Sequence, residues 1–344
     1  MSINKFPLGL ALIASSVTCV SAQDSSVVYT DPVGYVKLGN TAEGEPAVAS
    51  FSDLRVSVPL ERTAEFVGTV SSASSNALTL EGNPGFDAGR WVAAEGEAPY
   101  LIKVNSTNES GAWGLISANT ADTVTATAIT GDFANLVTGN EIEILRAWTV
   151  GNIFEGQTIP GGTQLFLYGG DVAGVNINPS TILLFDGTNW RDTFNSFEIT
   201  NDLVLHQGEG FILRTDSGVI NDLAIFGDVP VASHRVTIVK NDDQISQDTQ
   251  IGFLGAVPEI IGESGLGFTG GDELFVYDSA ATGQNQSPST ILLFDGTDWR
   301  DTFDSFSIVS SEFELKPGEG YIYRQANGLA GDYEWTDVQS HNEN

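Results

Sequence analysis

The stretch PSTILLFDGTNWRDTFNSFEI spans Pro179–Ile199, and the stretch PSTILLFDGTDWRDTFDSFSI spans Pro288–Ile308. The two differ at only three positions, so the chain carries one block of sequence twice. Each block has an apolar run suited to a central strand, then Asp-Gly, then Trp-Arg-Asp. Asp-Gly between β-forming runs is a strong hairpin signal, because Gly adopts positive φ without steric cost. Each block therefore predicts one β-hairpin.

The sequence leaves the length of the hairpin loop open. A two-residue loop would place Leu183 opposite Trp190, whereas a four-residue loop would place Phe185 opposite Trp190. The exchange of Asn189 for Asp298 between the blocks suits a turn position. In either arrangement the Trp lies against apolar neighbours.

The repeat extends beyond the hairpins. Matching segments flank both of them, namely Gly161–Tyr168 with Gly270–Tyr277, Gln207–Arg214 with Pro317–Arg324, and more faintly Leu54–Glu61 with Gly252–Glu259. Residues 62–147 have no counterpart in the second copy, yet they have their own strand pattern and Gly turns. Such a segment is expected of a small domain inserted into a loop, where its termini lie close together.

The rest of the chain has the pattern of an all-β protein. Short runs of β-forming residues recur between Gly, Asn, Asp and Pro, and no stretch after the N-terminal segment keeps an apolar period of 3.6 residues. We predict two related β-sandwich or barrel-like modules from an internal duplication, with a small β domain inserted in the first. The predicted ranges are 31–61 plus 148–228 for the first module, 62–147 for the inserted domain and 231–338 for the second module.

The N-terminus has the features of a secretory signal peptide at residues 1–22. Lys5 precedes an apolar run, and Val20-Ser21-Ala22 offers small residues for cleavage after Ala22. The run is too short to span a bilayer of about 30 Å, which takes roughly 20 residues. A lipid anchor on Cys19 is a weaker alternative, since Thr18 fits a lipobox poorly. Cleavage would remove the only cysteine, so we expect neither disulfides nor thiolate chemistry in an exported mature chain.

The net charge of the chain limits the classes of partner that we expect it to bind. The formal net charge is −31, with 45 acidic residues against 14 basic ones, and such a polyanion repels phosphate backbones and anionic lipids. We therefore expect no nucleic-acid partner and no membrane span in the mature chain. The expected location is periplasmic, cell-surface or extracellular, and the expected partners are extracellular glycans or other envelope proteins.

The repeated Trp-Arg-Asp run is the one candidate ligand site. It comprises Trp190, Arg191 and Asp192 in the first copy and Trp299, Arg300 and Asp301 in the second. A Trp ring could stack on a sugar while Arg and Asp form hydrogen bonds with its hydroxyl groups. The competing interpretation, which we favour, is a Trp that covers a core beside an Arg–Asp surface pair worth about 0–1 kcal/mol.

Other chemistry finds little support in the sequence. Gly265–Gly270 fits G-x-G-x-x-G, but strand-like residues follow it where a dinucleotide site needs a helix. His206, His234 and His341 lack the spacing of metal ligands. Asn241–Asp243 with Asp248 could form a loose calcium loop, although a solvated acidic loop is the simpler interpretation. We assign no catalytic residue, metal or cofactor, and with so many carboxylates a two-carboxylate glycosidase stays open.

Several segments together carry a family resemblance. Val28–Tyr35, Phe66–Val70 and the paired FDGTxW and GEGF/Y motifs are similar to an uncharacterised family of exported proteins that occurs in many copies in verrucomicrobia-like bacteria. The resemblance covers most of the mature chain and implies an envelope or extracellular location. It supplies no active site. It favours a structural or binding role over a housekeeping enzyme.

Three functional hypotheses follow. The first is an exported, non-enzymatic β protein with a structural, surface-assembly or adhesion role. The second is a glycan-binding protein that uses the duplicated Trp-Arg-Asp hairpins, which requires open Trp ring faces. The third is an extracellular polysaccharide-processing enzyme, which requires two carboxylates about 5–10 Å apart in a cleft.

Overall fold

The computed structural model describes residues 33–106, 109–169, 174–239, 246–253, 255–326 and 333–337. In these residues the regular structure consists of β-strands and one short 3-10 turn, η2 (Phe133–Asn135), so the predicted all-β fold is confirmed. Among the same residues, no helix has the length and apolar character that crossing a bilayer demands. The predicted signal peptide lies outside the described residues.

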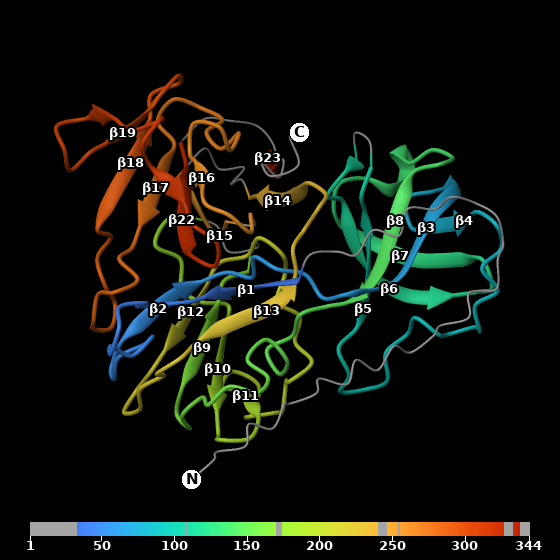
Figure 1. Ribbon diagram of the computed structural model, residues 1–344, viewed down its shortest axis with the longest axis horizontal. Helices are drawn as coiled ribbons and strands as arrows, with labels where there is room; N and C mark the ends of the chain where they lie inside the picture. The colour runs from blue at the N-terminus through green and yellow to red at the C-terminus, as the bar shows by residue number, and fades with distance from the viewer. Residues whose placement is uncertain are drawn as a thin grey trace, which may run out of the picture. The chain divides into compact units, whose positions relative to one another are not determined.

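The first module contains a five-stranded antiparallel sheet (Figure 1). Its strands, in spatial order, are β11 (Trp190–Asp192), β10 (Thr181–Phe185), β9 (Gln164–Leu167), β12 (Phe211–Arg214) and β2 (Asp53–Val56). Successive side chains of a strand point to opposite faces of its sheet, so alternate residues of β2, Leu54 and Val56, are buried.

The second module contains a six-stranded sheet built in the same succession. Its strands, in spatial order, are β20 (Ser307–Ile308), β19 (Trp299–Asp301), β18 (Thr290–Phe294), β17 (Glu273–Val276), β22 (Gly320–Gln325) and β15 (Gln247–Gly252). From β19 onward, each strand matches one of the first sheet, and β20 is an additional edge strand. Two of the three matched pairs of segments form matched strands. The faint match of Leu54–Glu61 with Gly252–Glu259 is displaced by three residues, because strand pairing aligns Asp53–Val56 with residues 248–251. The duplication that would explain the matches stays a prediction.

Both hairpins have the longer of the two possible loops. Phe185 pairs with Trp190 across the first hairpin, and Phe294 pairs with Trp299 across the second. In the first loop, the Asp186 carboxylate accepts hydrogen bonds from the backbone N–H groups of Thr188 and Asn189, at 2.9 and 2.8 Å. The exchanged residue before the Trp is an acceptor in both copies, because Asn189 Oδ1 accepts from the Asn201 side chain at 2.8 Å and Asp298 Oδ1 accepts from the Ser310 hydroxyl at 3.1 Å.

A closed barrel lies between residues 62 and 147, the range predicted for the inserted domain. Its strands, in spatial order, are β3 (Ala64–Ala73), β4 (Ala77–Leu80), β7 (Thr123–Thr130), β6 (Trp113–Asn119), β5 (Tyr100–Val104) and β8 (Glu141–Arg146). Closure removes the unpaired strand edges that would otherwise invite aggregation. The insertion itself and the predicted domain boundaries remain predictions.

Three two-stranded ribbons complete the strands. They are β1 (Val33–Lys37) with β13 (Ala224–Asp228), β14 (His234–Ile238) with β23 (Tyr333–Asp337), and β16 (Glu259–Ile260) with β21 (Glu314–Leu315). The largest groups of buried apolar side chains lie in the first module, in the barrel and in the second module. Trp190 belongs to the first of these cores and Trp299 to the third.

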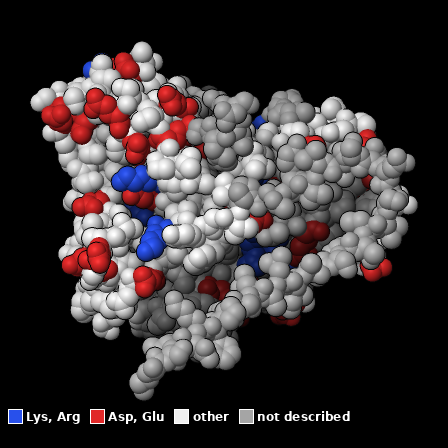
Figure 2. Space-filling view, in the orientation of Figure 1, with Lys and Arg blue, Asp and Glu red and all other residues white. Residues whose placement is uncertain are grey.

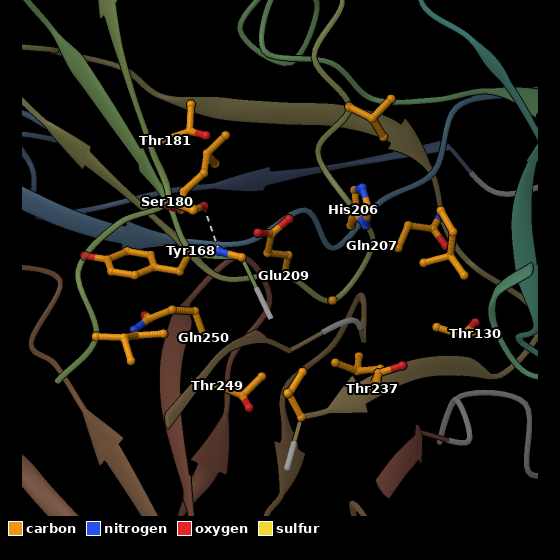
Figure 3. A pocket seen from close by; sticks show the side chains of 18 of the residues that line it. Thr130, Tyr168, Ser180, Thr181, His206, Gln207, Glu209, Thr237, Thr249 and Gln250 are labelled. Atoms are coloured by element: carbon orange, nitrogen blue, oxygen red, sulfur yellow. Dashed lines mark hydrogen bonds between the residues drawn. The ribbon is translucent and has the colours of Figure 1, made fainter. Parts of the chain in front are cut away.

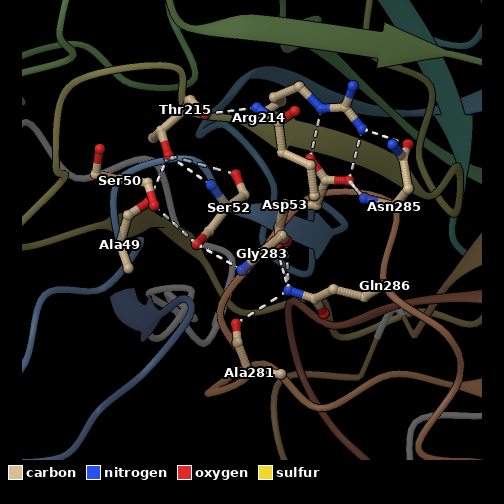
Figure 4. Close-up of polar contacts among 11 residues, drawn as sticks. Ala49, Ser50, Ser52, Asp53, Arg214, Thr215, Ala281, Gly283, Asn285 and Gln286 are labelled. Atoms are coloured by element: carbon tan, nitrogen blue, oxygen red, sulfur yellow. Dashed lines mark hydrogen bonds and ion pairs between the residues drawn. The ribbon is translucent and has the colours of Figure 1, made fainter.

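The first module holds a loop of the second module through a polar clasp (Figure 4). The Arg214 guanidinium donates to both carboxylate oxygens of Asp53, at 2.6 and 2.7 Å. Asp53 also accepts from the Asn285 backbone N–H at 2.7 Å, and Arg214 donates to the Asn285 side chain at 2.8 Å. A bidentate Arg–carboxylate pair is among the stronger polar contacts in proteins, so this clasp fixes the loop on β2 and β12.

The second module holds a loop of the first module in the same way. Arg324 donates to both carboxylate oxygens of Asp248, at 2.7 and 3.0 Å, and Asp248 accepts from the Asn176 backbone N–H at 2.6 Å. The residues correspond one by one to those of the first clasp. Each module therefore binds a loop of the other module through an equivalent set of hydrogen bonds.

Candidate functional site

The tryptophans of the predicted ligand site lie in the cores. The exposed fraction is 3% for Trp190 and 1% for Trp299. The ring of Trp190 packs at 5.1 Å from Phe185, and that of Trp299 at 5.3 Å from Phe294. Neither ring has an open face on which a sugar could stack, so this part of the ligand-site hypothesis lacks the surface that it requires.

The Arg and Asp residues of the same motif hold the backbone of a loop. Arg191 pairs with Asp186 in the hairpin turn and donates to the Phe197 carbonyl at 3.1 Å. The Asp192 carboxylate accepts from the Phe194 backbone N–H at 2.8 Å. Both side chains are therefore engaged within their own hairpin.

The second hairpin repeats these contacts. Arg300 pairs with Asp295 at 2.5 Å and donates to the Phe306 carbonyl at 3.3 Å, while Asp301 accepts from the Phe303 backbone N–H at 2.8 Å. In both copies, the Arg and Asp side chains of the motif therefore hold the backbone of the loop that follows the motif.

That loop presents apolar side chains to solvent in both modules. We call Thr193–Ile199 and Thr302–Ile308 the Phe loops. The exposed fractions are 62% for Phe194, 51% for Phe197 and 54% for Ile199, and 60%, 52% and 49% for Phe303, Phe306 and Ile308. Single exposed apolar residues are ordinary, but three clustered in a short loop and repeated in a second loop are the kind of feature that marks an interaction surface.

The Phe loops also share an uncommon backbone. Ser196 and Phe197 have φ values of 52° and 59°, and Ser305 and Phe306 have the same values. A bulky residue in the left-handed region is an outlier that costs of order 1–3 kcal/mol and persists only where surrounding contacts impose it. Here the imposing contacts are those of the Arg and Asp side chains, and the result is an aromatic ring held outward.

A cavity with a mixed polar and apolar lining surrounds Glu209 (Figure 3). It has a volume of about 320 Å³ and draws its lining from the barrel, the first module and the second module. Its polar lining includes Thr130, Tyr168, His206, Thr237 and Gln250, and its apolar lining includes Ile129, Leu167, Leu203 and Val236. That volume and mixture suit a small molecule.

Glu209 is held in this cavity by a turn that joins the two modules. The Gly208 carbonyl accepts from the Gly252 backbone N–H at 2.8 Å, and Glu209 forms a β-bridge with Ile251. A Cβ atom on Gly210 would lie 2.5 Å from the Ile251 carbonyl oxygen, so only glycine permits this approach. The turn at Gly208–Gly210 is therefore also a contact between the modules.

Burial raises the pKa of Glu209 to about 7, and a backbone hydrogen bond with His206 opposes that rise. Burial also lowers the pKa of His206, so its imidazole is neutral near pH 7. No described residue forms an ion pair with Glu209. A carboxyl group that titrates near neutrality inside a cavity is a recognised mark of a functional site.

A second cavity, of about 360 Å³, surrounds the equivalent turn of the second module. There Glu319 pairs with Lys316 at 3.7 Å and accepts from the Tyr321 hydroxyl at 3.1 Å. Burial raises the pKa of Glu319, and the positive charge of Lys316 opposes this. Glu319 thus has a cationic partner, whereas no described residue forms an ion pair with Glu209.

The remaining candidates occupy structural positions. His234 is buried beside the Glu61–Lys103 ion pair, and burial, followed by the charge of Lys103, holds its pKa well below its usual range. Within Gly265–Gly270, the backbone N–H of Phe268 donates to Asp272, which immediately precedes β17. His341 and Asn241–Asp243 lie outside the described residues, and the described part of the chain holds no metal-binding group of three or more His, Cys, Asp or Glu side chains.

In comparisons with known proteins, no family model, no curated protein and no solved structure matches this chain.

On the face shown in Figure 2, acidic side chains are spread widely and basic ones are few, in keeping with the composition.

Sequence reasoning missed both the Phe loops and Glu209. The signal for the loops was available, because Phe and Ile recur in both copies among Asn, Asp and Ser residues that favour turns. No such signal existed for the cavity, whose walls come from three distant parts of the chain.

Proposed function

We propose that the protein is an exported, non-enzymatic β protein that acts in surface assembly or adhesion, with the two Phe loops as its docking elements. The observation that carries this proposal is the repetition of the exposed surface. Both loops display two Phe rings and one Ile from the same strained backbone. The repeated Arg and Asp side chains preserve that backbone rather than a binding pocket.

Two docking elements on one chain suit attachment to an extended surface. Linking two binding elements makes the second contact intramolecular, which can raise the overall affinity 10²- to 10⁴-fold without any new contact. The partner that fits best is another envelope protein with apolar surface, because the side chains offered are apolar and aromatic. The Phe rings, rather than the buried Trp rings, would also be the faces available to a glycan.

The test uses the purified mature chain and envelopes from producing cells that lack its gene. We expect the wild-type chain to co-sediment with these envelopes. Replacing Phe194 and Phe197 with Ser should weaken binding at least about tenfold through lost avidity, and adding Phe303→Ser and Phe306→Ser should abolish it.

The matched control removes exposed apolar residues elsewhere. Val67 and Val137 in the barrel region are 64% and 61% exposed, and the double Ser variant should bind like the wild type. Binding of the four-Phe variant at wild-type strength would refute the proposal. A glycan array with the same proteins separates glycan attachment from protein attachment.

For the enzymatic alternative, the cavity around Glu209 offers a carboxyl group whose pKa is raised by burial. Its other described carboxylate is Asp248, which is already paired with Arg324 and accepts from Asn176. This arrangement favours binding over two-carboxylate catalysis, in which one group acts as acid and the other as base or nucleophile.

A further inference from the structure

The comparison between the two modules identifies what Glu209 lacks. In the aligned turns, His206 stands where the second module has Lys316, and Phe211 stands where it has Tyr321. Lys316 and Tyr321 are the two partners of Glu319. The first module therefore keeps the carboxyl group and has replaced both side chains that would satisfy it.

A neighbouring strand shows the same loss of positive charge. Strand pairing places Gln250 at the position that Arg55 occupies in the first module, since Val56 pairs with Phe211 and Ile251 pairs with Tyr321. The cavity around Glu319 is lined by Arg55, Lys316 and Lys37, whereas the described lining around Glu209 contains no Lys or Arg.

The other charged and titratable groups around Glu209 do not supply a cation. Asp248 is paired with Arg324, and the burial-lowered pKa of His206 leaves its imidazole neutral. Burial raises the pKa of Tyr168, so its hydroxyl stays protonated. Arg55 lies outside the lining and donates to the Gln250 side chain at 3.0 Å. An anionic ligand would meet only like charge or neutral groups here.

We propose that the cavity around Glu209 binds a small organic cation, a primary alkylammonium, whose ammonium group takes the position that the Lys316 amine occupies beside Glu319. The alkyl part would lie against Leu203, Ile129 and Val236, and hydroxyl groups such as that of Thr237 would accept from the remaining ammonium N–H groups. The volume of about 320 Å³ accommodates a chain of several carbons. The strongly negative field of the chain raises the local concentration of such cations.

Binding should depend on pH in a defined direction. An ammonium ion binds the ionised carboxylate, and burial raises the pKa of Glu209 to about 7, so affinity should rise from pH 5.5 to pH 8.5. At 1.5 pH units below its pKa only about 3% of a carboxyl group is ionised, which predicts an affinity about 30-fold lower at pH 5.5. Binding below neutrality should be accompanied by proton release.

The experiment is calorimetric titration of the mature chain with n-hexylammonium, n-hexanol and hexanoate at pH 8.5 and 5.5. We expect saturable binding of n-hexylammonium alone, about 30-fold weaker at the lower pH. Glu209→Gln should weaken binding at least about tenfold. His206→Lys, which places an internal ammonium beside Glu209, should do the same.

Glu319→Gln is the matched control, because it alters the equivalent carboxyl group of the second module and should leave binding unchanged. The four-Phe variant should also bind normally, which separates this inference from the proposed docking function. Absence of saturable n-hexylammonium binding, equal binding of n-hexanol, or wild-type affinity in Glu209→Gln would each overturn the inference. If His206→Lys does not fold, the affinity of Glu209→Gln for n-hexylammonium alone tests the inference.

Discussion

The two clasps between the modules predict a large and matched loss of stability when either carboxylate is removed. In Asp248→Ala, Arg324 loses both of its hydrogen bonds to the carboxylate, and the Asn176 backbone N–H loses its acceptor. The Asp248 side chain is only 1% exposed, but that of Arg324 is 20% exposed. The charge left behind is therefore partly hydrated.

The magnitude follows from that geometry. Removing one partner of a fully buried ion pair costs about 3–5 kcal/mol, because the other charge is left uncompensated. Partial hydration of Arg324 reduces this, so we expect the free energy of unfolding to fall by about 2–4 kcal/mol. Asp53→Ala should cost the same within about 1 kcal/mol, since Asp53 is 8% exposed in an equivalent clasp.

Urea unfolding followed by tryptophan fluorescence measures the effect, because each module has a Trp in its core. The control is Glu97→Ala, which breaks the pair with Arg146 at 3.3 Å, where Glu97 is 56% exposed. Exposed pairs contribute about 0–1 kcal/mol, so this variant should unfold almost like the wild type. If Asp248→Ala cost no more than Glu97→Ala, the reasoning that these clasps hold the modules together would be refuted.

Three further predictions concern the turn, its carboxyl group and the Phe loops. Gly210→Ala places a Cβ 2.5 Å from a backbone oxygen and should cost about 2 kcal/mol or more in urea, whereas Gly161→Ala, with its nearest atom at 3.6 Å, should be tolerated. Burial raises the pKa of Glu209 to about 7 from an ordinary 4.5, so the folded chain binds more protons than the unfolded chain between those values. The unfolding free energy should therefore fall relative to Glu209→Gln as pH rises from 4.5 to 7, by up to about 3 kcal/mol, and a pH-independent difference would contradict this. Phe197→Gly relieves a φ of 59° and should leave thermal stability unchanged or raise it by about 1 kcal/mol while weakening envelope binding; a clear loss of stability would show that the ring supports the fold.

Local patterns predicted the strands and turns of this protein well. Thr181–Phe185 and its copy form strands with a neighbouring strand on each side, as predicted, although only the middle Leu of each is fully buried. Asp186-Gly187 forms the turn because Gly187 adopts a φ of 98°. The position of Trp190 against apolar neighbours followed from the same pattern. These inferences needed only residues close together in the sequence.

The candidate site was less accessible to sequence reasoning. Trp190, Arg191 and Asp192 were identified because they repeat, yet repetition does not distinguish a residue that binds from one that positions. The structure places the Trp190 ring in the core, and the Arg191 and Asp192 side chains form hydrogen bonds with backbone groups. The apolar surface that is exposed to solvent belongs instead to Phe194 and Phe197.

The sequence by itself determined the β class, the repeated hairpins and the acidic character, because these depend on composition and on short-range periodicity. Only the tertiary structure decided the closure of the barrel, the paired clasps and the isolation of Glu209 within its cavity. Those features depend on contacts between residues far apart in the chain, such as Asp248 with Asn176 and Gly208 with Gly252. Whether a carboxyl group keeps its ordinary pKa is set by such neighbours, and no local pattern specifies them.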